Sequence, residues 1–318
     1  MRRLVTALLL AGTFAIPAAA EYPDKPIRLI VPQAAGSATD TVARILGAEL
    51  GKELGQQIIV DNRAGGALTI GLDITAKSEP DGYTICMGPI GAVAITRHMV
   101  AKLPYDIERD FQPIALVARG HMLLAVAPDA PFKTVPELID YAKKNPGKLN
   151  YGSSGTGSPH HLAGELLHQK TGIDIAHIPY KGGGAAVNDL IGGHIGMAFL
   201  SLSAAVPHMN TGKIRIIAMV EKTRYAALPD IPTIGETVPG FEMSSWVGVF
   251  APAGTPADIV AKLNDGIAKV LTAEAVKAKL AALGLVVVAG KPEELAQVVK
   301  EGLRVRGELV KAAGIQPE

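Results

Sequence analysis

The sequence predicts an α/β protein made of two modules, each a mostly parallel sheet covered by helices. Three observations support this fold class. Short apolar and β-branched runs alternate with amphipathic helical patterns, small-residue loops follow the strands, and 318 residues suffice for roughly two domains. Sheets of this kind bind ligands at the carboxyl ends of their strands, so the loops that follow strands are the first places to look for a site.

The first twenty residues are typical of a secretory signal peptide. Arg2 and Arg3 give a positive start, residues 4–16 form an apolar run too short to span a bilayer, and Ala18-Ala19-Ala20 offers a small-residue cleavage site. We therefore expect cleavage after Ala20 and a mature protein in the periplasm.

Charge and cysteine content argue against a nucleic-acid-binding protein and against a fold held by disulfides. The chain has 31 Lys and Arg residues against 30 Asp and Glu residues, and this near neutrality gives no support to a nucleic-acid-binding surface. The single cysteine, Cys86, cannot form an internal disulfide, so an exported protein of this size depends on its hydrophobic core. Because Cys86 lies in an apolar strand pattern, we expect a buried structural thiol.

In the first module a strand, a small-residue loop and a helix recur. The predicted strands cover 27–31, 57–60 and 82–87, and the predicted helices cover 39–54 and 70–77. The loops at 33–39, 63–68 and 88–91 each follow a strand and are expected at one rim of the sheet. Ser37 or Thr39 caps the first helix. Asp40, in its first turn, either stabilises the helix start or contacts a ligand, and we favour the helix start.

The second module occupies roughly residues 123–245. A strand predicted at 111–117 precedes it, further strands are predicted at 121–127, 149–151, 175–178, 195–200 and 214–220, and helices are predicted at 135–144, 159–172 and 185–191. An apolar segment at 246–251 follows, and the tail, with helices at 257–271, 273–283 and 292–312 and a strand at 285–288, is expected to return to the first module. The chain then crosses between the modules twice, near residues 123 and 245. Two crossings make a hinge, and ligands commonly bind between domains.

The strand-to-helix stretch from Tyr151 to His161 is the strongest candidate for part of a site. Its small residues, hydroxyls and unpaired helix N–H groups suit an anion. Ser158 as N-cap, with Pro159 at the first helical position, is a strong helix start. His160 and His161, in the first turn, either flank a ligand or stabilise the loop.

Other chemistries fit these residues less well. Gly152 to Thr156 fails the G-x-S-x-G pattern at its last position, and the sequence places no base and acid beside a serine. His161, Glu165 and His168 share a helix face and could hold zinc, but a solvated face is the simpler interpretation. Gly182 to Val187 meets only part of the dinucleotide motif G-x-G-x-x-G. We therefore expect no catalytic residue, no metal and no cofactor.

The sequence leaves two possible roles for each of two further residues, Lys181 and Trp246. Lys181 lies in a glycine-rich loop and either pairs with an anion or is simply exposed. Trp246, the only tryptophan, lies at the second crossing, where a core position is favoured over the wall of a ligand site.

A series of short motifs, in order along nearly all the mature chain, resembles the Bug-type periplasmic receptors of the tripartite tricarboxylate transporter system. The motifs are Tyr22 to Ile27, Val31 to Asp40, Asn62-Arg63, Asp81 to Thr84, Leu103 to Asp106 with Asp110-Phe111, Gly152 to Gly155, His161 to Glu165, Pro179 to Gly183, Leu228 to Thr233 and Ala251 to Pro256. Each motif is modest alone, and the order makes the set specific.

The resemblance implies a two-lobed periplasmic-binding-protein-like fold with a hinged interdomain cleft that closes on a small carboxylate. Backbone N–H groups, hydroxyls and ordered water would hold the ligand without an arginine clamp. The implied division is a signal peptide at 1–20, a first lobe at 21–122 and 246–318, and a second lobe at 123–245. The turns 33–39 and 153–158 would face each other. The implied ligand contacts are Ala35, Gly36, Ser37, Ser153 and Ser158, with Gly88, Pro89 and Ser201 as weaker candidates.

The sequence departs from the family pattern at several positions. Ala35-Gly36-Ser37 stands where the family often has Pro-Gly-Gly, and Arg63 to Thr69 departs from the usual Arg-Pro-Gly-Ala-Gly-Gly-Asn. Leu200 stands where an acidic residue is common after a second-lobe strand. We interpret Leu200 as favouring a carboxylate with an aromatic or aliphatic body.

These observations predict a monomeric periplasmic solute-binding receptor that captures a small organic carboxylate and delivers it to integral-membrane transporter subunits. Two alternatives stay open at this point. One is an exported hydrolase-like enzyme that uses His160, His161 or a serine. The other is a ligand-dependent sensor or docking protein that works through a sensor domain without transport, and sequence cannot separate it from the receptor because both would use one cleft.

Overall fold

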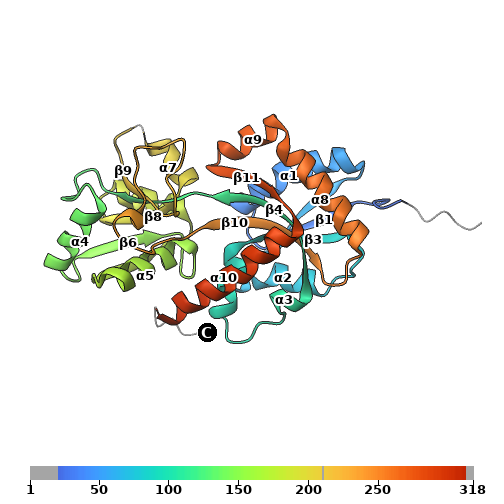
Figure 1. Ribbon diagram of the computed structural model, residues 1–318, viewed down its shortest axis with the longest axis horizontal. Coiled ribbons are helices and arrows are strands. Elements are labelled where there is room, and N and C mark those ends of the chain that lie inside the picture. Colours follow the sequence, from blue (N-terminus) through green and yellow to red (C-terminus); the bar gives the residue numbers. More distant parts are fainter. Residues whose placement is uncertain (1–20, 210, 313–318) are drawn as a thin grey trace, which may run out of the picture.

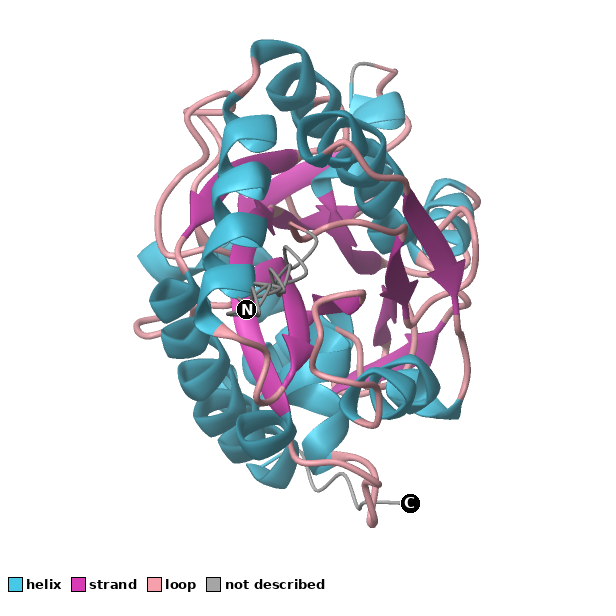
Figure 2. Ribbon diagram, turned by 90° about the vertical axis from the view of Figure 1, so that its right-hand side faces the viewer, coloured by secondary structure: helices cyan, strands magenta, loops and turns pink. Residues whose placement is uncertain are grey.

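The computed structural model describes residues 21–209 and 211–312, which form two lobes side by side (Figure 1). The predicted signal peptide at residues 1–20 lies outside the described residues. Each lobe is built on its own sheet, and helices form the outer layer (Figure 2). Across the described ranges, no helix combines the length and the apolar character that a bilayer span needs.

The sheet of the first lobe has six strands in the order β11-β4-β10-β3-β1-β2. Their bounds are β1 (Ile27–Val31), β2 (Ile58–Asn62), β3 (Thr84–Pro89), β4 (Phe111–Gly120), β10 (Ser245–Pro252) and β11 (Leu285–Gly290). Strand β1 pairs in parallel with β2 and β3, whereas β10 runs antiparallel to β3 and β4. The sheet is therefore mixed, and the prediction of a mostly parallel sheet was wrong here, because the chain leaves along β4 and returns along β10.

Helices cover both faces of this sheet. They are α1 (Ala38–Leu54), α2 (Thr69–Ala76), α3 (Ile107–Asp110), α8 (Ala257–Thr272), α9 (Glu274–Ala281) and α10 (Pro292–Ala312). Because successive strand residues point to opposite faces, Leu29 packs in one core with Leu46 and Leu263, and Ile30 packs in the other with Leu72 and Leu295. This two-sided burial explains why β1 is apolar at every position except Arg28, the pattern from which it was predicted.

The second lobe has a five-stranded sheet in the order β7-β6-β8-β5-β9. Its strands are β5 (Met122–Val126), β6 (Leu149–Ser153), β7 (Ile175–Pro179), β8 (Met197–Ser201) and β9 (Arg215–Met219), and its helices are α4 (Val135–Lys144), α5 (Pro159–Thr171), α6 (Gly183–Ile191) and α7 (Leu202–Met209). Strand β6 is parallel to β7 and β8, whereas β5 is antiparallel to β8 and β9. One face of helix α5 packs Leu162 and Leu166 into a core with Tyr151 and Phe199.

Three segments within the described residues run between the lobes. Strand β4 passes into β5 at His121, and residues 242–244 lead into β10. Helix α10 begins against the first sheet, but Leu309 and Val310 near its end belong to the core of α5 and β6 (Figure 1). The last turns of α10 therefore pack on the second lobe, although the tail begins on the first. The exact division at 21–122, 123–245 and 246–318 stays a prediction.

The sequence prediction missed several short helical segments. They are η1 (Gly66–Leu68), the π-helical turn η2 (Gly91–Ile95), η3 (Thr96–His98), α3, α7 and η4 (Ile234–Glu236). Strand β3 also extends through Gly88 and Pro89, which were predicted to lie in a loop. Both residues pair with β10, and a Cβ atom on Gly88 would overlap the side chains of Phe250 and Val93. Close packing explains this glycine without a ligand.

Replacing Gly164 in helix α5 with alanine should destabilise the second lobe. The added Cβ atom would overlap the ring of Tyr151, which is fully buried and has no room to move. We expect a loss of about 1–3 kcal/mol in the free energy of unfolding, measured by urea titration. The matched control is Gly184→Ala in helix α6, where the new Cβ meets nothing within 4 Å, so its stability should be unchanged or slightly higher. Equal stabilities of the two variants would contradict this account of the core.

Candidate functional site

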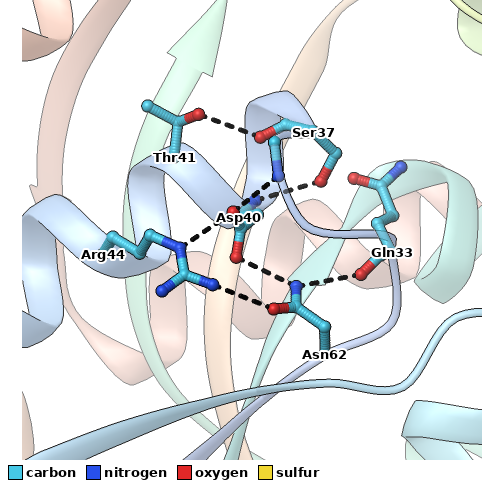
Figure 3. Close-up of polar contacts among 7 residues, drawn as sticks. Gln33, Ser37, Asp40, Thr41, Arg44 and Asn62 are labelled. Atoms are coloured by element: carbon cyan, nitrogen blue, oxygen red, sulfur yellow. Dashed lines mark hydrogen bonds and ion pairs between the residues drawn. The ribbon is translucent and has the colours of Figure 1, made fainter.

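A tight turn connects β1 to α1 in the first lobe. The Ser37 N–H donates to the Ala34 carbonyl at 3.2 Å, and Gly36 has a φ of 82°, as the third residue of a type II turn requires. Ser37 is the N-cap of α1, and its Oγ accepts the Asp40 N–H at 3.2 Å. In return, Asp40 Oδ2 accepts the Gly36 N–H at 2.8 Å (Figure 3). The helix end is thus capped from two sides.

Asp40 is the buried support of this turn. Its carboxylate also accepts the Asn62 Nδ2–H at 2.9 Å and the Arg44 Nε–H at 3.0 Å (Figure 3). Burial alone would raise the pKa of Asp40, but the hydrogen bonds from Arg44, Gly36 and Asn62 outweigh it and hold that pKa below its usual value. The carboxylate is therefore ionised and accepts three hydrogen bonds from the protein itself, which agrees with the helix-start interpretation.

The turn between β6 and α5 in the second lobe repeats this geometry. The Ser158 N–H donates to the Gly155 carbonyl at 3.1 Å, and Gly157 has a φ of 73°. Ser158 caps α5 as predicted, and its Oγ accepts the His161 N–H at 3.2 Å. The Gly157 N–H donates to His161 Nδ1 at 3.0 Å. His161 therefore occupies the place that Asp40 has in the first lobe.

His161 lies on a buried network beneath the second turn. Its side chain is 7 % exposed, and its ring stacks on His177 of β7 with centroids 3.9 Å apart and planes 10° apart. His177 Nε2 lies 2.7 Å from Ser153 Oγ, and the Tyr151 hydroxyl donates to Glu165 Oε1 at 2.6 Å. The prediction of a solvated face through His161 was wrong, because strand β7 brings an aromatic partner that the helix pattern alone could not reveal.

Burial keeps the histidines of this region neutral. Burial lowers the pKa of His160 to about 4, and burial together with the neighbouring His161 lowers the pKa of His177 to about 4. Burial also lowers the pKa of His161, although Glu165 acts in the opposite direction. His160 Nδ1 lies 2.7 Å from Ser154 Oγ, so this histidine stabilises the loop, which is one of its two predicted roles.

The predicted contact residues occupy two separate turns and a few other places. Ala35 and Gly36 are exposed and Ser37 half-buried in the first turn, whereas Ser158 is half-buried in the second. Ser153 is fully buried, and its Oγ is bonded to His177 and to the Gly155 N–H. No hydrogen bond joins the two turns within residues 21–209 and 211–312. Their opposition across a cleft and the individual ligand contacts stay predictions.

The remaining predicted residues lie on other segments of the two lobes. Ser201 ends β8, where its Oγ accepts the Ala204 N–H of α7 at 3.4 Å. Leu200 is fully buried in a core with Leu123 and Ala205, so it packs inside the second lobe and the interpretation that it shapes a ligand was wrong. Lys181 is exposed. Trp246 and Cys86 are buried in the first-lobe core, and burial raises the pKa of the Cys86 thiol to about 12.

Several residues that support the turns escaped prediction from the sequence. Asn62 joins Asp40 to the Gln33 carbonyl, and His177 supports both Ser153 and His161. Both come from a neighbouring strand, so no local spacing marks them. The one local signal was the repeat of Gly-Ser followed three residues later by a hydrogen-bond acceptor. In the part of the chain that the structure describes, no group of three or more His, Cys, Asp or Glu residues is placed to hold a metal ion.

Comparisons with known proteins place this geometry among transport receptors. Residues 42–315 match the protein family described as tripartite tricarboxylate transporter family receptor. The chain is 34% identical over 306 residues to protein BugT of Bordetella pertussis, covering 96% of this chain and 94% of BugT. The structure of R. palustris Rpa4515 with adipate is similar with a TM-score of 0.84 at 36% identity, covering 94% of this chain and 100% of that one.

A second solved structure extends this comparison. MatC (Rpa3494) from Rhodopseudomonas palustris with bound malate has a TM-score of 0.79 at 33% identity, covering 91% of this chain and 100% of that one. These neighbours confirm the predicted two-lobed α/β fold.

Acidification should lower the free energy of unfolding through the buried histidines. Because their pKa values are lowered on folding, the unfolded chain binds more protons between about pH 6.5 and pH 4, and stability falls as the pH drops through this window. Each such group contributes a slope of up to about 1.4 kcal/mol per pH unit. Urea titrations at several pH values measure the slope. His177→Gln, which keeps an acceptor near Ser153 Oγ but does not titrate, should reduce it, and an unchanged slope would refute this assignment.

Proposed function

The chain belongs to the tripartite tricarboxylate transporter receptor family, as its motifs predicted, and we propose that it captures a small organic carboxylate between its lobes and delivers it to a membrane transporter. The observation that carries this proposal is the pair of equivalent capped turns. Each turn follows a parallel strand, ends at the N-terminus of a long helix and carries a serine at the N-cap. Such helix ends attract anions through their free N–H groups and the helix dipole.

The serine hydroxyls are suited to bind a carboxylate. Ser37 Oγ and Ser158 Oγ each accept a backbone N–H of their own helix, which leaves each hydroxyl proton free to donate. The Gly36 and Gly157 N–H groups, by contrast, are already bonded to Asp40 and His161. We therefore assign direct contacts to the two serine hydroxyls ahead of the glycine N–H groups.

Ser153 has a supporting role in this proposal. It is fully buried and bonded to His177, so it stabilises the second turn from beneath. The same burial weakens the hydrolase alternative. Ser153 and His177 are within nucleophile-to-base distance at 2.7 Å, but a serine without exposed surface cannot meet a substrate. We propose binding without catalysis.

Dicarboxylates are the first ligand class to test, because two structurally similar proteins hold adipate and malate. We further propose that the receptor works in the periplasm after removal of residues 1–20 and presents its ligand to integral-membrane subunits. The alternative function is that of a sensor, which would bind its ligand at the same site without transport. A pull-down from solubilised membranes with the liganded protein distinguishes the two functions. A transport receptor should capture transporter subunits, whereas a sensor should capture a protein with a sensor domain.

A thermal-shift screen across mono-, di- and tricarboxylates should find at least one acid that raises the melting temperature. A ligand that binds only the native state stabilises it by about 2.7 kcal/mol at one hundred times its dissociation constant, which corresponds to a shift of several degrees. Neutral sugars of similar size are the control and should give no shift. A shift with sugars and none with any acid would overturn the proposed function.

The variants Ser37→Ala and Ser158→Ala should each weaken carboxylate binding about tenfold, because each removes a donor to a charged ligand. Isothermal titration calorimetry measures the dissociation constants. Each substitution also removes a helix cap, at a cost of about 1 kcal/mol in stability. Thr134→Ala is the matched control, since Thr134 caps α4 through the Glu137 N–H at 3.4 Å and lies in neither turn. The control should lose similar stability and keep full affinity, whereas equal affinity in all three variants would remove the serines from the site.

A further inference from the structure

The two capped turns differ in one chemically important respect. In the first lobe the acceptor beneath the turn is a carboxylate, Asp40, which three donors hold in its ionised form. In the second lobe the acceptor is the imidazole of His161. A carboxylate accepts hydrogen bonds over the whole physiological pH range, but an imidazole nitrogen accepts only when it carries no proton.

The contacts of His161 indicate which ring nitrogen carries its proton. Because Nδ1 accepts the Gly157 N–H at 3.0 Å, Nδ1 is unprotonated and the ring proton lies on Nε2, which is 3.7 Å from Glu165 Oε1. Protonation of Nδ1 would set two donors against each other at this contact. The Gly157 N–H would then lose its acceptor in a partly buried place, and the turn would lose one of the two bonds that cap α5.

The surroundings of His161 do not favour a second proton. The titratable groups around it come from three elements, namely His160 and Glu165 from α5, Tyr151 from β6 and His177 from β7. His177 stacks on the ring at 3.9 Å, so a charged His161 would lie against a second imidazole. Glu165 is the one compensating group, and its Oε1 already accepts the Tyr151 hydroxyl at 2.6 Å.

We propose that His161 is a positioning residue for the ligand site: its unprotonated Nδ1 holds the turn that presents Ser158, so carboxylate affinity falls when His161 gains a proton. This inference rests on the proposed function and deepens it. The first lobe has no such dependence, because Asp40 keeps its charge and pairs with Arg44. A neutral acceptor in the second lobe also spares an anionic ligand the repulsion of a second buried carboxylate.

Two substitutions of His161 separate positioning from general packing. In His161→Asn the amide oxygen takes the place of Nδ1 and accepts the Gly157 N–H, but it does not titrate. In His161→Ala the acceptor is lost. His168→Ala is the control on the same helix, since His168 is exposed and bonds to the Ile173 carbonyl, outside the turn.

The experiment is isothermal titration calorimetry of adipate and malate at pH 7.5, 6.5, 5.5 and 4.5, with folding verified by circular dichroism at each pH. We expect His161→Ala to weaken binding about tenfold at pH 7.5 and His161→Asn to stay within a few-fold of the wild type. Between pH 6.5 and 4.5 the affinity of the wild type should fall more steeply than that of His161→Asn. Protonation of the ligand changes the affinity of every variant equally. It therefore cancels when the dissociation constant of the wild type is divided by that of His161→Asn at the same pH.

The outcomes distinguish this inference from the function on which it rests. If the wild type binds a carboxylate and His161→Asn shows the same pH profile as the wild type, the positioning role is overturned and the function stands. If His161→Ala does not fold, the comparison of His161→Asn with the wild type and His168→Ala still decides. If the wild type binds no carboxylate at any pH, the proposed function fails and this inference fails with it.

Discussion

The candidate site depends on one local interaction, which is the reciprocal cap of a helix by a serine and by the side chain three residues later. In both lobes the serine Oγ accepts an N–H of the helix, and the later side chain accepts the N–H of the preceding glycine. These bonds fix the direction in which the serine hydroxyl and the first turn of the helix point. Without them, a glycine-rich turn would sample many conformations, and a ligand would have to order it at the expense of affinity.

Each cap needs support from residues that are distant in sequence. Asp40 is an almost fully buried charge, and such a group is tolerated only when donors surround it, which Arg44 and Asn62 provide. His161 is buried as a neutral ring, so it needs no charged partner. Its support is the ring of His177, which stacks on it. The two lobes thus reach the same turn geometry through different chemistry, a charged carboxylate in the first lobe and a neutral stacked imidazole in the second.

This difference explains which parts of the site could be predicted from the sequence. The N-cap at Ser158, the strand-to-helix turns and most strands follow from local patterns, because backbone hydrogen bonds and period decide them. The burial of His161 could not be predicted, since a helix face next to a distant strand has the same sequence pattern as a face next to water. The placement of Gly88 in a loop was wrong for a related reason, because a strand glycine that makes room for Phe250 looks the same in sequence as a loop glycine, and its predicted ligand contact stays a prediction.

The second turn is also linked to the first lobe. A Cβ atom on Gly157 would overlap the side chain of Met99, so the end of η3 lies directly against the turn. The end of α10 packs in the same core as α5, the helix that the turn begins. Gly157, the residue whose N–H the His161 ring holds, therefore lies at a direct contact between the second turn and the segment that follows β3. The turn that begins α5 is thus packed against segments that also contact elements of the first lobe.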